Sequence, residues 1–301
     1  MVADQGPGLP GRTPQARQAP RRGREVSGGG AAVITFLLLA LVGFVGIVTL
    51  LTYTLYCYEE TNQSGRPLAP FLAMAGRTAL RSVASELVIV ALHPLGLWPG
   101  LWSRPTPGSS LVVLVHGLFH NPGAWILFRR RLHAQGFGTA CFRYASWGSR
   151  WEETVADLTT YLAKILEENP DRPVHLVGHS LGGLLLRCAL AQSPDPRIRT
   201  LVTLGTPYGG SKLSPFALSS LGRYLTYRGE TVMRVATLPT PADVRCLALY
   251  SPADNMVLPN SALRCGLQGW DERQTRPVSH VAMLHSRDVF DKALEWVRRP
   301  A

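Results

Sequence analysis

Lysine is scarce in this sequence, although the chain carries a formal net charge of +11 at neutral pH. Lys164, Lys212 and Lys292 are its only lysines, so arginine supplies nearly all of the positive charge. That charge is spread along the chain, apart from a cluster of arginines near the start. The sequence has no basic helix interleaved with aromatic residues, which argues against nucleic acid as a partner.

Metal-binding motifs are also missing. The five cysteines include no C-x-x-C pair, and the eight histidines show no zinc-binding spacing. We therefore expect the protein to use neither a metal nor an organic cofactor. Outside the cytoplasm Cys246 and Cys265 could form a disulfide, but buried free thiols fit their spacing equally well.

Charged residues are absent from Ala31 to Tyr58. This run is longer than the about 20 residues that cross a bilayer. It also exceeds the about 7–15 apolar residues of a cleavable signal peptide. Because the run has no polar face, a buried core helix does not explain it, and we predict a transmembrane anchor over residues 31–58.

The flanks of this run predict its orientation. Residues 1–30 are rich in Gly, Pro and Arg and poor in apolar residues, which predicts a disordered basic tail. The arginines before the anchor and Glu59-Glu60 after it place the N-terminus in the cytoplasm. We expect a single-pass protein of a bacterial inner membrane, with the remaining chain on the outer, periplasmic side.

Residues 59–110 form a juxtamembrane segment and a linker. Apolar residues alternate with Arg77, Arg81 and Glu86 at helical spacing, which predicts an amphipathic helix. This helix either lies along the membrane surface or packs on the following domain. The stretch 87–102 is interrupted by Pro94 and Pro99 and is too short to span a membrane.

From Leu111 onward, short apolar runs alternate with helical patterns. This alternation predicts an α/β domain over residues 111–301, with a mostly parallel sheet covered by helices on both faces. The predicted strands are 111–115, 139–144, 174–178, 198–204 and 246–250. The rhythm breaks at residues 208–240, which we interpret as a cap inserted after a strand end.

The most informative motif is Gly178-His179-Ser180-Leu181-Gly182. An apolar run precedes it and an apolar helical pattern follows it. Strand, sharp turn and helix is the setting in which Gly-x-Ser-x-Gly forms a nucleophile elbow, with glycine where side chains would clash. We therefore predict that Ser180 is a nucleophile.

A serine hydroxyl needs a base and a group that orients the base. His280 precedes the last predicted helix and is the preferred base, with His285 as its rival. Asp254 follows a strand directly and is preferred over Asp243 and Asp271 as the orienting acid.

Two backbone amides should stabilise the oxyanion of the reaction, those of Leu118 and Leu181. Leu118 follows the His116-Gly117 turn and Leu181 follows the nucleophile. His116 and His179 are each fixed within a tight turn, so we expect them to pack beside the site rather than act as bases.

The order of these motifs resembles the α/β-hydrolase superfamily. The segments 249–257 (LYSPADNMV) and 279–286 (SHVAMLHS) further resemble the acid and histidine segments of small bacterial triacylglycerol lipases. The resemblance covers about residues 111–300 and implies an α/β-hydrolase fold and esterase activity. Those small lipases are nearly lidless, whereas residues 208–240 here are long enough to cover a site.

Together these features predict a membrane-anchored serine hydrolase that cleaves lipid-like or small carboxylic esters through an acyl-serine intermediate. An acyltransferase or thioesterase could use the same residues, and a third possibility is a non-catalytic tethered binding module. Within residues 208–240, most members of one apolar set are spaced to lie on a single helical stripe: Leu213, Phe216, Leu218, Leu221, Tyr224 and Leu225. We expect Phe119, Phe216 and Leu221 to contact the substrate, unless this stripe packs into the core of the domain. The sequence indicates no protein partner.

Overall fold

The computed structural model describes residues 1–2, 28–102 and 104–299. The chain divides into two units, Met1–Leu41 and Val42–Ala301. The tail predicted to be disordered lies mainly outside the described residues. Helix α1 (Gly28–Ser64) begins three residues before the predicted anchor and continues six residues beyond it.

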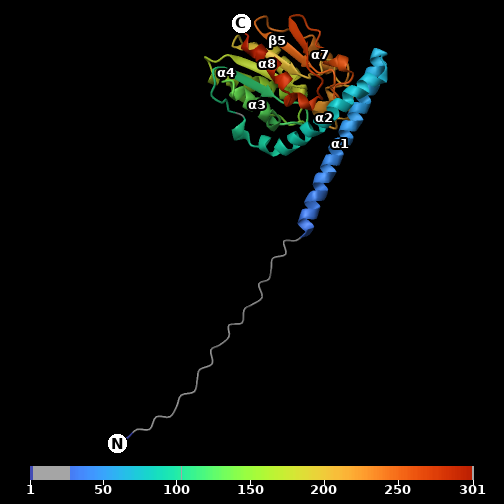
Figure 1. Ribbon diagram of the computed structural model, residues 1–301. Coiled ribbons are helices and arrows are strands. Elements are labelled where there is room, and N and C mark those ends of the chain that lie inside the picture. Colours follow the sequence, from blue (N-terminus) through green and yellow to red (C-terminus); the bar gives the residue numbers. More distant parts are fainter. Residues whose placement is uncertain (3–27, 103, 300–301) are drawn as a thin grey trace. The chain divides into compact units, whose positions relative to one another are not determined.

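The larger unit contains a six-stranded parallel sheet with the strand order β2-β1-β3-β4-β5-β6 (Figure 1). This topology confirms the predicted α/β architecture. The strands are β1 (Leu111–Val115), β2 (Gly138–Phe142), β3 (Val174–His179), β4 (Ile198–Leu204), β5 (Arg245–Tyr250) and β6 (Trp270–Gln274).

Strand β6 was not predicted from the sequence. Its residues, WDERQ, lack the apolar run that marks the other strands, and none of them is fully buried. As an edge strand it pairs only with β5, from Cys246↔Trp270 to Tyr250↔Gln274. An edge strand needs no continuous apolar run, because its outer side faces solvent.

Both faces of the sheet are covered by helices. Leu111, Val113 and Val115 of β1 pack in one core with α4 and α5, while Val112 and Leu114 pack in the other with α3 and α8. This alternation follows from the two-residue period of a strand. The helices are α3 (Ile126–His133), α4 (Trp151–Glu168), α5 (Leu181–Gln192) and α8 (Arg287–Arg298).

Helix α2 (Leu68–Gly96) belongs to the larger unit, and its Ile89 packs into the core that contains α3 and α8. This contact corresponds to the second of the two arrangements expected for this segment, and contact with a membrane surface stays a prediction. Pro94 does not break α2, because it lies only two residues before the last residue of the helix, Gly96. The buried side of α2 consists mainly of small and apolar residues: Phe71, Ala75, Thr78, Ser82, Ser85, Ile89 and Gly96.

Among the residues that the structure describes, two helices are long and apolar enough to cross a membrane, Gly30–Ser64 and Leu68–Gly96. They differ in composition, because α2 carries Arg77, Arg81 and Glu86 whereas α1 has no charge between Ala31 and Tyr58. An N-terminal apolar helix such as α1 is compatible with a single membrane span or with a signal sequence.

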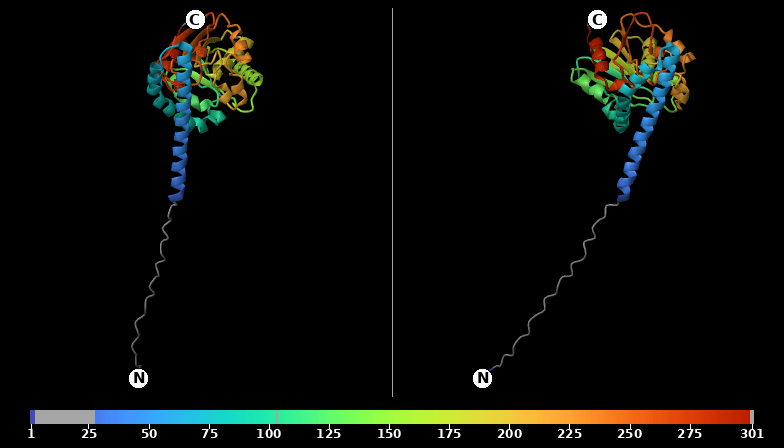
Figure 2. Two further views of the ribbon diagram at one scale, coloured as in Figure 1. Left: turned by 90° about the vertical axis from the view of Figure 1, so that its right-hand side faces the viewer. Right: turned by 45° about the vertical axis from the view of Figure 1, so that its right-hand side comes forward.

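Within the larger unit, the last turns of α1 lie beside the first turns of α2 (Figure 2). Tyr53, Tyr56 and Cys57 of α1 form a small apolar cluster with Phe71 of α2 and with Leu258. Tyr56 contacts Tyr53 and Phe71 edge to face, with ring centroids 5.9 and 6.2 Å apart. The end of α1 is therefore part of the folded unit.

The segment 208–240 does not contain the single helical stripe predicted for it. It forms η3 (Ser214–Phe216), α6 (Ser220–Arg223) and α7 (Glu230–Ala236), joined by turns. Phe216 and Leu218 are 74% and 80% exposed, whereas Leu221 is completely buried in the main core. Because turns separate these short elements, Phe216 and Leu218 point into solvent while Leu221 points into the core.

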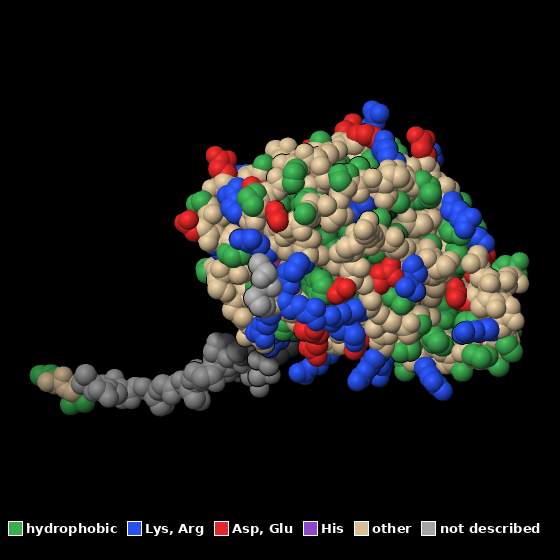
Figure 3. Space-filling view, turned by 90° about the horizontal axis from the view of Figure 1, so that it is seen from above, with side chains coloured by type: hydrophobic (Ala, Val, Ile, Leu, Met, Phe, Trp, Pro, Cys, Tyr) green, Lys and Arg blue, Asp and Glu red, His purple; other side chains and the backbone are tan. Residues whose placement is uncertain are grey.

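The remaining elements are short 3₁₀ helices. They are η1 (Pro99–Leu101), η2 (Pro122–Trp125), η4 (Asn260–Leu263) and η5 (Val281–Leu284). On the face of the larger unit seen in Figure 3, basic side chains are interspersed with acidic ones. This mixture matches the spread of arginine along the sequence.

Candidate active site

Ser180 lies at the tip of the turn between β3 and α5, with a backbone φ of 54°. A positive φ is unusual for a residue with a side chain. The turn is crowded, because a Cβ added at Gly178 would lie 2.6 Å from the nitrogen of Gly183. One added at Gly182 would lie 2.3 Å from the oxygen of Val115. Both positions therefore require glycine, and the Ser180 side chain is left at the carboxyl edge of the sheet.

Asp254 and His280 are joined by a short, buried hydrogen bond. His280 Nδ1 lies 2.6 Å from Asp254 Oδ2, and the Asp254 side chain is inaccessible to solvent. The other carboxylate oxygen, Oδ1, accepts hydrogen bonds of 2.9 Å from the amides of Met256 and Val257. These contacts fix the carboxylate from both sides and match the acceptor-only character of an ionised aspartate.

The end of β4 brings this pair to the serine. The Leu204 carbonyl oxygen accepts a hydrogen bond of 2.8 Å from the Ser180 amide. A Cβ added at the next residue, Gly205, would lie 3.2 Å from His280 Nδ1 and 3.3 Å from Asp254 Oδ2. Gly205 has a φ of 58°, so glycine is needed there for its backbone as well as for space. The structure thus gathers Ser180, Asp254 and His280 at one edge of the sheet.

The loop after β1 packs directly over the serine turn. A Cβ added at Gly117 would lie 3.0 Å from Ser180 Cβ. Two amides of this loop are already used: Phe119 N–H donates to Ser146 Oγ at 2.7 Å and His120 N–H to Gly117 O at 3.3 Å. Leu118, which was predicted as an oxyanion donor, directly precedes these two residues.

The amide of Leu181, the other predicted donor, belongs to the first residue of α5. The first amides of a helix have no acceptor within the helix and carry the positive end of its dipole. This amide is therefore available to donate a hydrogen bond to an anion beside Ser180.

Three histidines surround the site: His116 and His179 are buried, and His120 is partly buried. The rings of His179 and His280 lie 4.7 Å apart between centroids, and those of His120 and His179 lie 5.8 Å apart. Burial lowers the pKa of His116 to about 4 and that of His120 to about 3. Burial, reinforced by His280 and His120, lowers the pKa of His179 well below its usual value. These rings are therefore neutral at pH 7 and add no positive charge near His280.

His116 and His179 occupy packing positions, as their tight turns suggested. The His116 ring stacks on Tyr144 with centroids 4.2 Å apart, and Tyr144 Oη donates to the His116 carbonyl oxygen at 2.8 Å. His179 Nε2 lies 3.1 Å from the His280 carbonyl oxygen.

The rival acid and base lie elsewhere. His285 ends η5, and its carbonyl oxygen accepts a hydrogen bond of 3.3 Å from Arg131. Asp271 lies on the edge strand β6, 4.0 Å from Arg273. Asp243 precedes β5 and therefore lies at the opposite end of that strand from Asp254. The structure brings none of these three to Asp254 or His280.

The three residues expected to contact substrate are not brought together. Phe119 has a φ of 61°, is 42% exposed and contacts Trp147 with ring centroids 5.3 Å apart. Phe216 projects from the surface, whereas Leu221 lies within the core. Phe216 and Leu221 therefore do not form one continuous wall.

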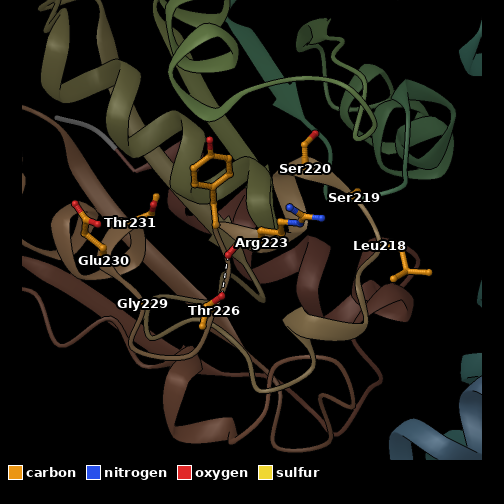
Figure 4. A pocket seen from close by; sticks show the side chains of 9 residues that line it. Leu218, Ser219, Ser220, Arg223, Thr226, Gly229, Glu230 and Thr231 are labelled. Carbon is orange, nitrogen blue, oxygen red and sulfur yellow. Dashed lines mark hydrogen bonds between the residues drawn. The ribbon is translucent and has the colours of Figure 1, made fainter.

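A hollow of about 730 Å³ opens within the segment 208–240. Figure 4 shows that its lining side chains are mostly polar and include Arg223, Thr226 and Glu230. Thr226 Oγ1 donates to the Arg223 carbonyl oxygen at 2.8 Å. Ser180 is not part of this lining, so the hollow lies within the segment 208–240 and is separate from the candidate site.

Sequence reasoning missed the residues that support the acid and histidine segments from outside the α/β domain. Thr52, Tyr53 and Tyr56 of α1 make hydrogen bonds to residues 252–255. A signal was present, because these hydroxyl-bearing residues recur on one side of an otherwise apolar helix. Glu86 of α2 was missed as a neighbour of His280.

All five cysteines are free thiols in the structure, Cys246 and Cys265 among them. Cys246 is buried and Cys265 is partly buried. Burial raises the pKa of each thiol to about 12. Both therefore remain protonated and unreactive near neutral pH.

Comparison with known proteins agrees with this architecture. Methylesterase 3 of Arabidopsis thaliana is 31% identical over 137 residues, which cover 43% of this chain and 52% of that protein. The triacylglycerol lipase of Burkholderia plantarii is 28% identical over 183 residues, covering 54% and 49% of the two chains. The chain thus spans about half the length of the curated relatives it matches.

Solved structures show the same fold. The mature lipase BlEst2 of Bacillus licheniformis superposes with a TM-score of 0.55 at 18% identity, covering 64% of this chain and 94% of that one. Residues 112–301, which include all six strands but for the first residue of β1, match the alpha/beta hydrolase family. The chain therefore belongs to the alpha/beta hydrolase family.

Proposed function

We propose that this protein is a serine hydrolase that cleaves carboxylic esters, with lipid-like esters favoured. The observation that carries the proposal is the buried Asp254–His280 pair beside the strained turn of Ser180. The names of the relatives, a methylesterase and a triacylglycerol lipase, support the same reaction class.

In the proposed mechanism, Ser180 Oγ attacks the ester carbonyl carbon while His280 Nε2 takes the hydroxyl proton. Asp254 holds Nδ1 of His280, which selects the tautomer with a free Nε2 and stabilises the imidazolium. His280 then gives the proton to the departing alcohol. Water, activated by His280, releases the acid from the acyl-serine.

The negative oxygen of the tetrahedral intermediate is placed between the amides of Leu118 and Leu181. Both belong to backbone that the fold fixes before substrate arrives, the first by the close packing of Gly117 on the serine turn. Losing one such donor typically costs about 3–4 kcal/mol of barrier. An ester whose carbonyl oxygen reaches this position needs no metal for its activation.

The first part of α1 is proposed as the membrane anchor. Residues 31–51 expose nearly all of their apolar side chains, among them Phe36, Phe44 and Leu50. About 20 helical residues extend about 30 Å, the thickness of the hydrocarbon core. Arginines before the helix and Glu59-Glu60 after its apolar part support an N-terminus in the cytoplasm and an ester-cleaving unit on the periplasmic side of a bacterial inner membrane.

Labelling and turnover test the chemistry. A fluorophosphonate probe should label Ser180 in the wild type and leave Ser180→Ala unlabelled. p-Nitrophenyl esters of graded chain length should be hydrolysed to free acids, even when a competing alcohol is present. Transfer of the acyl group mainly to the alcohol would instead identify an acyltransferase, and absence of labelling would identify a non-catalytic module.

Protease accessibility tests the orientation. Protease added to intact spheroplasts should remove the larger unit, while the same treatment of whole cells should leave it intact. Protection in spheroplasts would reverse the proposed orientation.

A further inference from the structure

The loop that carries Asp254 is held by hydroxyl groups of α1. Tyr56 Oη donates to the Pro252 carbonyl oxygen at 2.7 Å, and Tyr53 Oη donates to that of Ala253 at 3.4 Å. Asn255, on the other side of Asp254, donates from Nδ2 to Thr52 Oγ1 at 2.7 Å. A helix about 200 residues earlier in the chain thus contacts the residues on both sides of the candidate acid.

Asn255 connects α1 to the candidate base. Its Oδ1 accepts a hydrogen bond of 3.3 Å from the backbone amide of His280, while its Nδ2 meets Thr52. The orientation of this amide group is determined by its partners. The His280 N–H is a donor and must face oxygen, and the Thr52 hydroxyl already donates to the Thr49 carbonyl oxygen at 3.1 Å, so it accepts from nitrogen.

All members of this chain of hydrogen bonds are shielded from water. Thr52 is 9% exposed, Asn255 3% and His280 6%. A buried amide that loses one partner cannot replace it with bulk water, so it must move or remain unsatisfied. Either change shifts the His280 backbone, whose imidazole has to reach both Asp254 and Ser180.

We propose that Thr52 is a positioning residue for ester hydrolysis, acting through Asn255 on the backbone of His280. This inference rests on the proposed function. Thr52 touches no reacting atom, and its role is to fix where the imidazole begins its proton transfer. Displacements of about 1 Å in such a group lower turnover far more than they lower substrate binding.

Tyr56 contributes to the same function from the other side of Asp254. Its hydroxyl group holds the Pro252 carbonyl, and its ring is fully buried between Tyr53 and Phe71. The apolar helix therefore has two roles, and its docked turns form part of the support for the catalytic residues.

The test is Thr52→Val in the full-length, detergent-solubilised protein. Valine keeps the shape and removes the hydroxyl group. Fluorophosphonate titration counts competent sites, so that turnover is expressed per labelled Ser180. We expect kcat per site to fall about tenfold, with KM within twofold of the wild type, because one hydrogen bond of about 1.4 kcal/mol corresponds to tenfold. Thr52→Ser, which keeps the hydroxyl group, should restore at least half of kcat.

Thr54→Val is the matched control. Thr54 lies on the exposed side of the same helix, and its hydroxyl group donates only to the Leu50 carbonyl oxygen at 2.8 Å. This variant should have wild-type kcat and KM. If Thr52→Val also keeps wild-type kcat per site, or if Thr54→Val falls equally, the positioning role is refuted.

A second pair covers the case in which Thr52→Val does not fold. Tyr56→Phe removes a single hydroxyl group and keeps the ring, and we expect a threefold to tenfold lower kcat per site. Tyr58→Phe, at an exposed position, should leave kcat unchanged. Equal kcat in both variants would refute the support of the acid loop by α1. Failure of the proposed function is distinct, because the wild type itself would then hydrolyse no ester and take up no probe.

Discussion

The two sides of the candidate site are built in opposite ways. On the acid–histidine side, Asp254 and His280 are buried, and both are fixed by hydrogen bonds that extend to α1. On the cap side, residues 214–236 form three short helices joined by turns, and Phe216 and Leu218 project into solvent. The groups proposed to move protons are held by many contacts, whereas the groups proposed to meet an acyl chain are left exposed.

This difference has a physical reason. Proton transfer depends steeply on distance and angle, so its groups need many fixed partners. Contact with an acyl chain is non-directional and depends mainly on the area removed from water. The proposed cap, anchored by Leu221 in the core, can therefore keep its outer residues free for the proposed ester substrates of different length.

Removing the proton-transfer groups should have the largest effect. Ser180→Ala and His280→Ala should each lower ester turnover by about 10⁵-fold or more, because nucleophile and base act as one unit. Stopped assays with p-nitrophenyl esters and far-UV circular dichroism would show activity lost with the fold retained. His285→Ala should stay within about tenfold of the wild type. A reversed order of the two histidine variants would transfer the role of base to His285.

Neutralising the acid should come next. Asp254→Asn keeps the shape but presents an amide to His280 Nδ1, which favours the unproductive tautomer, and kcat should fall by about 10³–10⁴-fold. Pre-steady-state kinetics should place the loss in acylation. A loss of only a few-fold would mean that a different carboxylate orients His280, and the rigid side of the site would then lie elsewhere.

The cap should separate specificity from stability. Phe216→Ala should lower kcat/KM for long-chain esters about tenfold relative to acetate esters, since each buried methylene is worth about 0.8 kcal/mol. Its free energy of unfolding should change by no more than about 0.5 kcal/mol, because the side chain is exposed. Leu221→Ala should behave inversely, losing about 2–5 kcal/mol of stability without a change in chain-length preference. If Phe216→Ala and Leu221→Ala lose stability equally, the assignment of Phe216 to specificity and of Leu221 to stability is refuted.

The smallest expected effect concerns Glu86, a partly buried residue of α2 whose titration is influenced by His280. Burial raises the pKa of Glu86 from its usual 4.5 to about 7, while His280 lowers it. Between these values the folded protein binds more protons than the unfolded chain, so the free energy of unfolding should fall as pH rises from about 4.5 to 7. Glu86→Gln should flatten this dependence in urea titrations, and Glu167→Gln, at an exposed position of α4, should not. An unchanged slope for Glu86→Gln would contradict the burial of its charge.

Sequence patterns predicted five of the six strands and the serine turn because both have local signatures. Apolar runs mark buried strands, and the close approaches at Gly178 and Gly182 demand glycine at a fixed spacing. The proximity of Asp254 and His280 followed from strand ends meeting at one edge of a parallel sheet. The roles of these residues remain predictions.

Features that depend on tertiary contact could not be predicted in this way. Strand β6 forms because β5 offers a free edge, although its own residues are polar. The apolar residues of segment 208–240 do not form one stripe, because Phe216 belongs to η3 and Leu221 to α6. The spacing of apolar residues cannot show where such short helices end. The docking of α1 was missed, because the whole apolar run was assigned to the membrane and only the hydroxyl-bearing residues on one side of the helix indicated a protein contact.

The buried side of α1 also limits how this helix can change during evolution. Val45, Thr49, Thr52, Tyr53 and Tyr56 recur at intervals that keep them on one side of the helix, against the folded unit. A pure lipid anchor would tolerate almost any apolar replacement at every position. In relatives that share this architecture, the outward side should therefore exchange Leu, Ile, Val and Phe freely. The inward side should retain its hydroxyl-bearing residues and vary together with the Pro252–Asn255 segment.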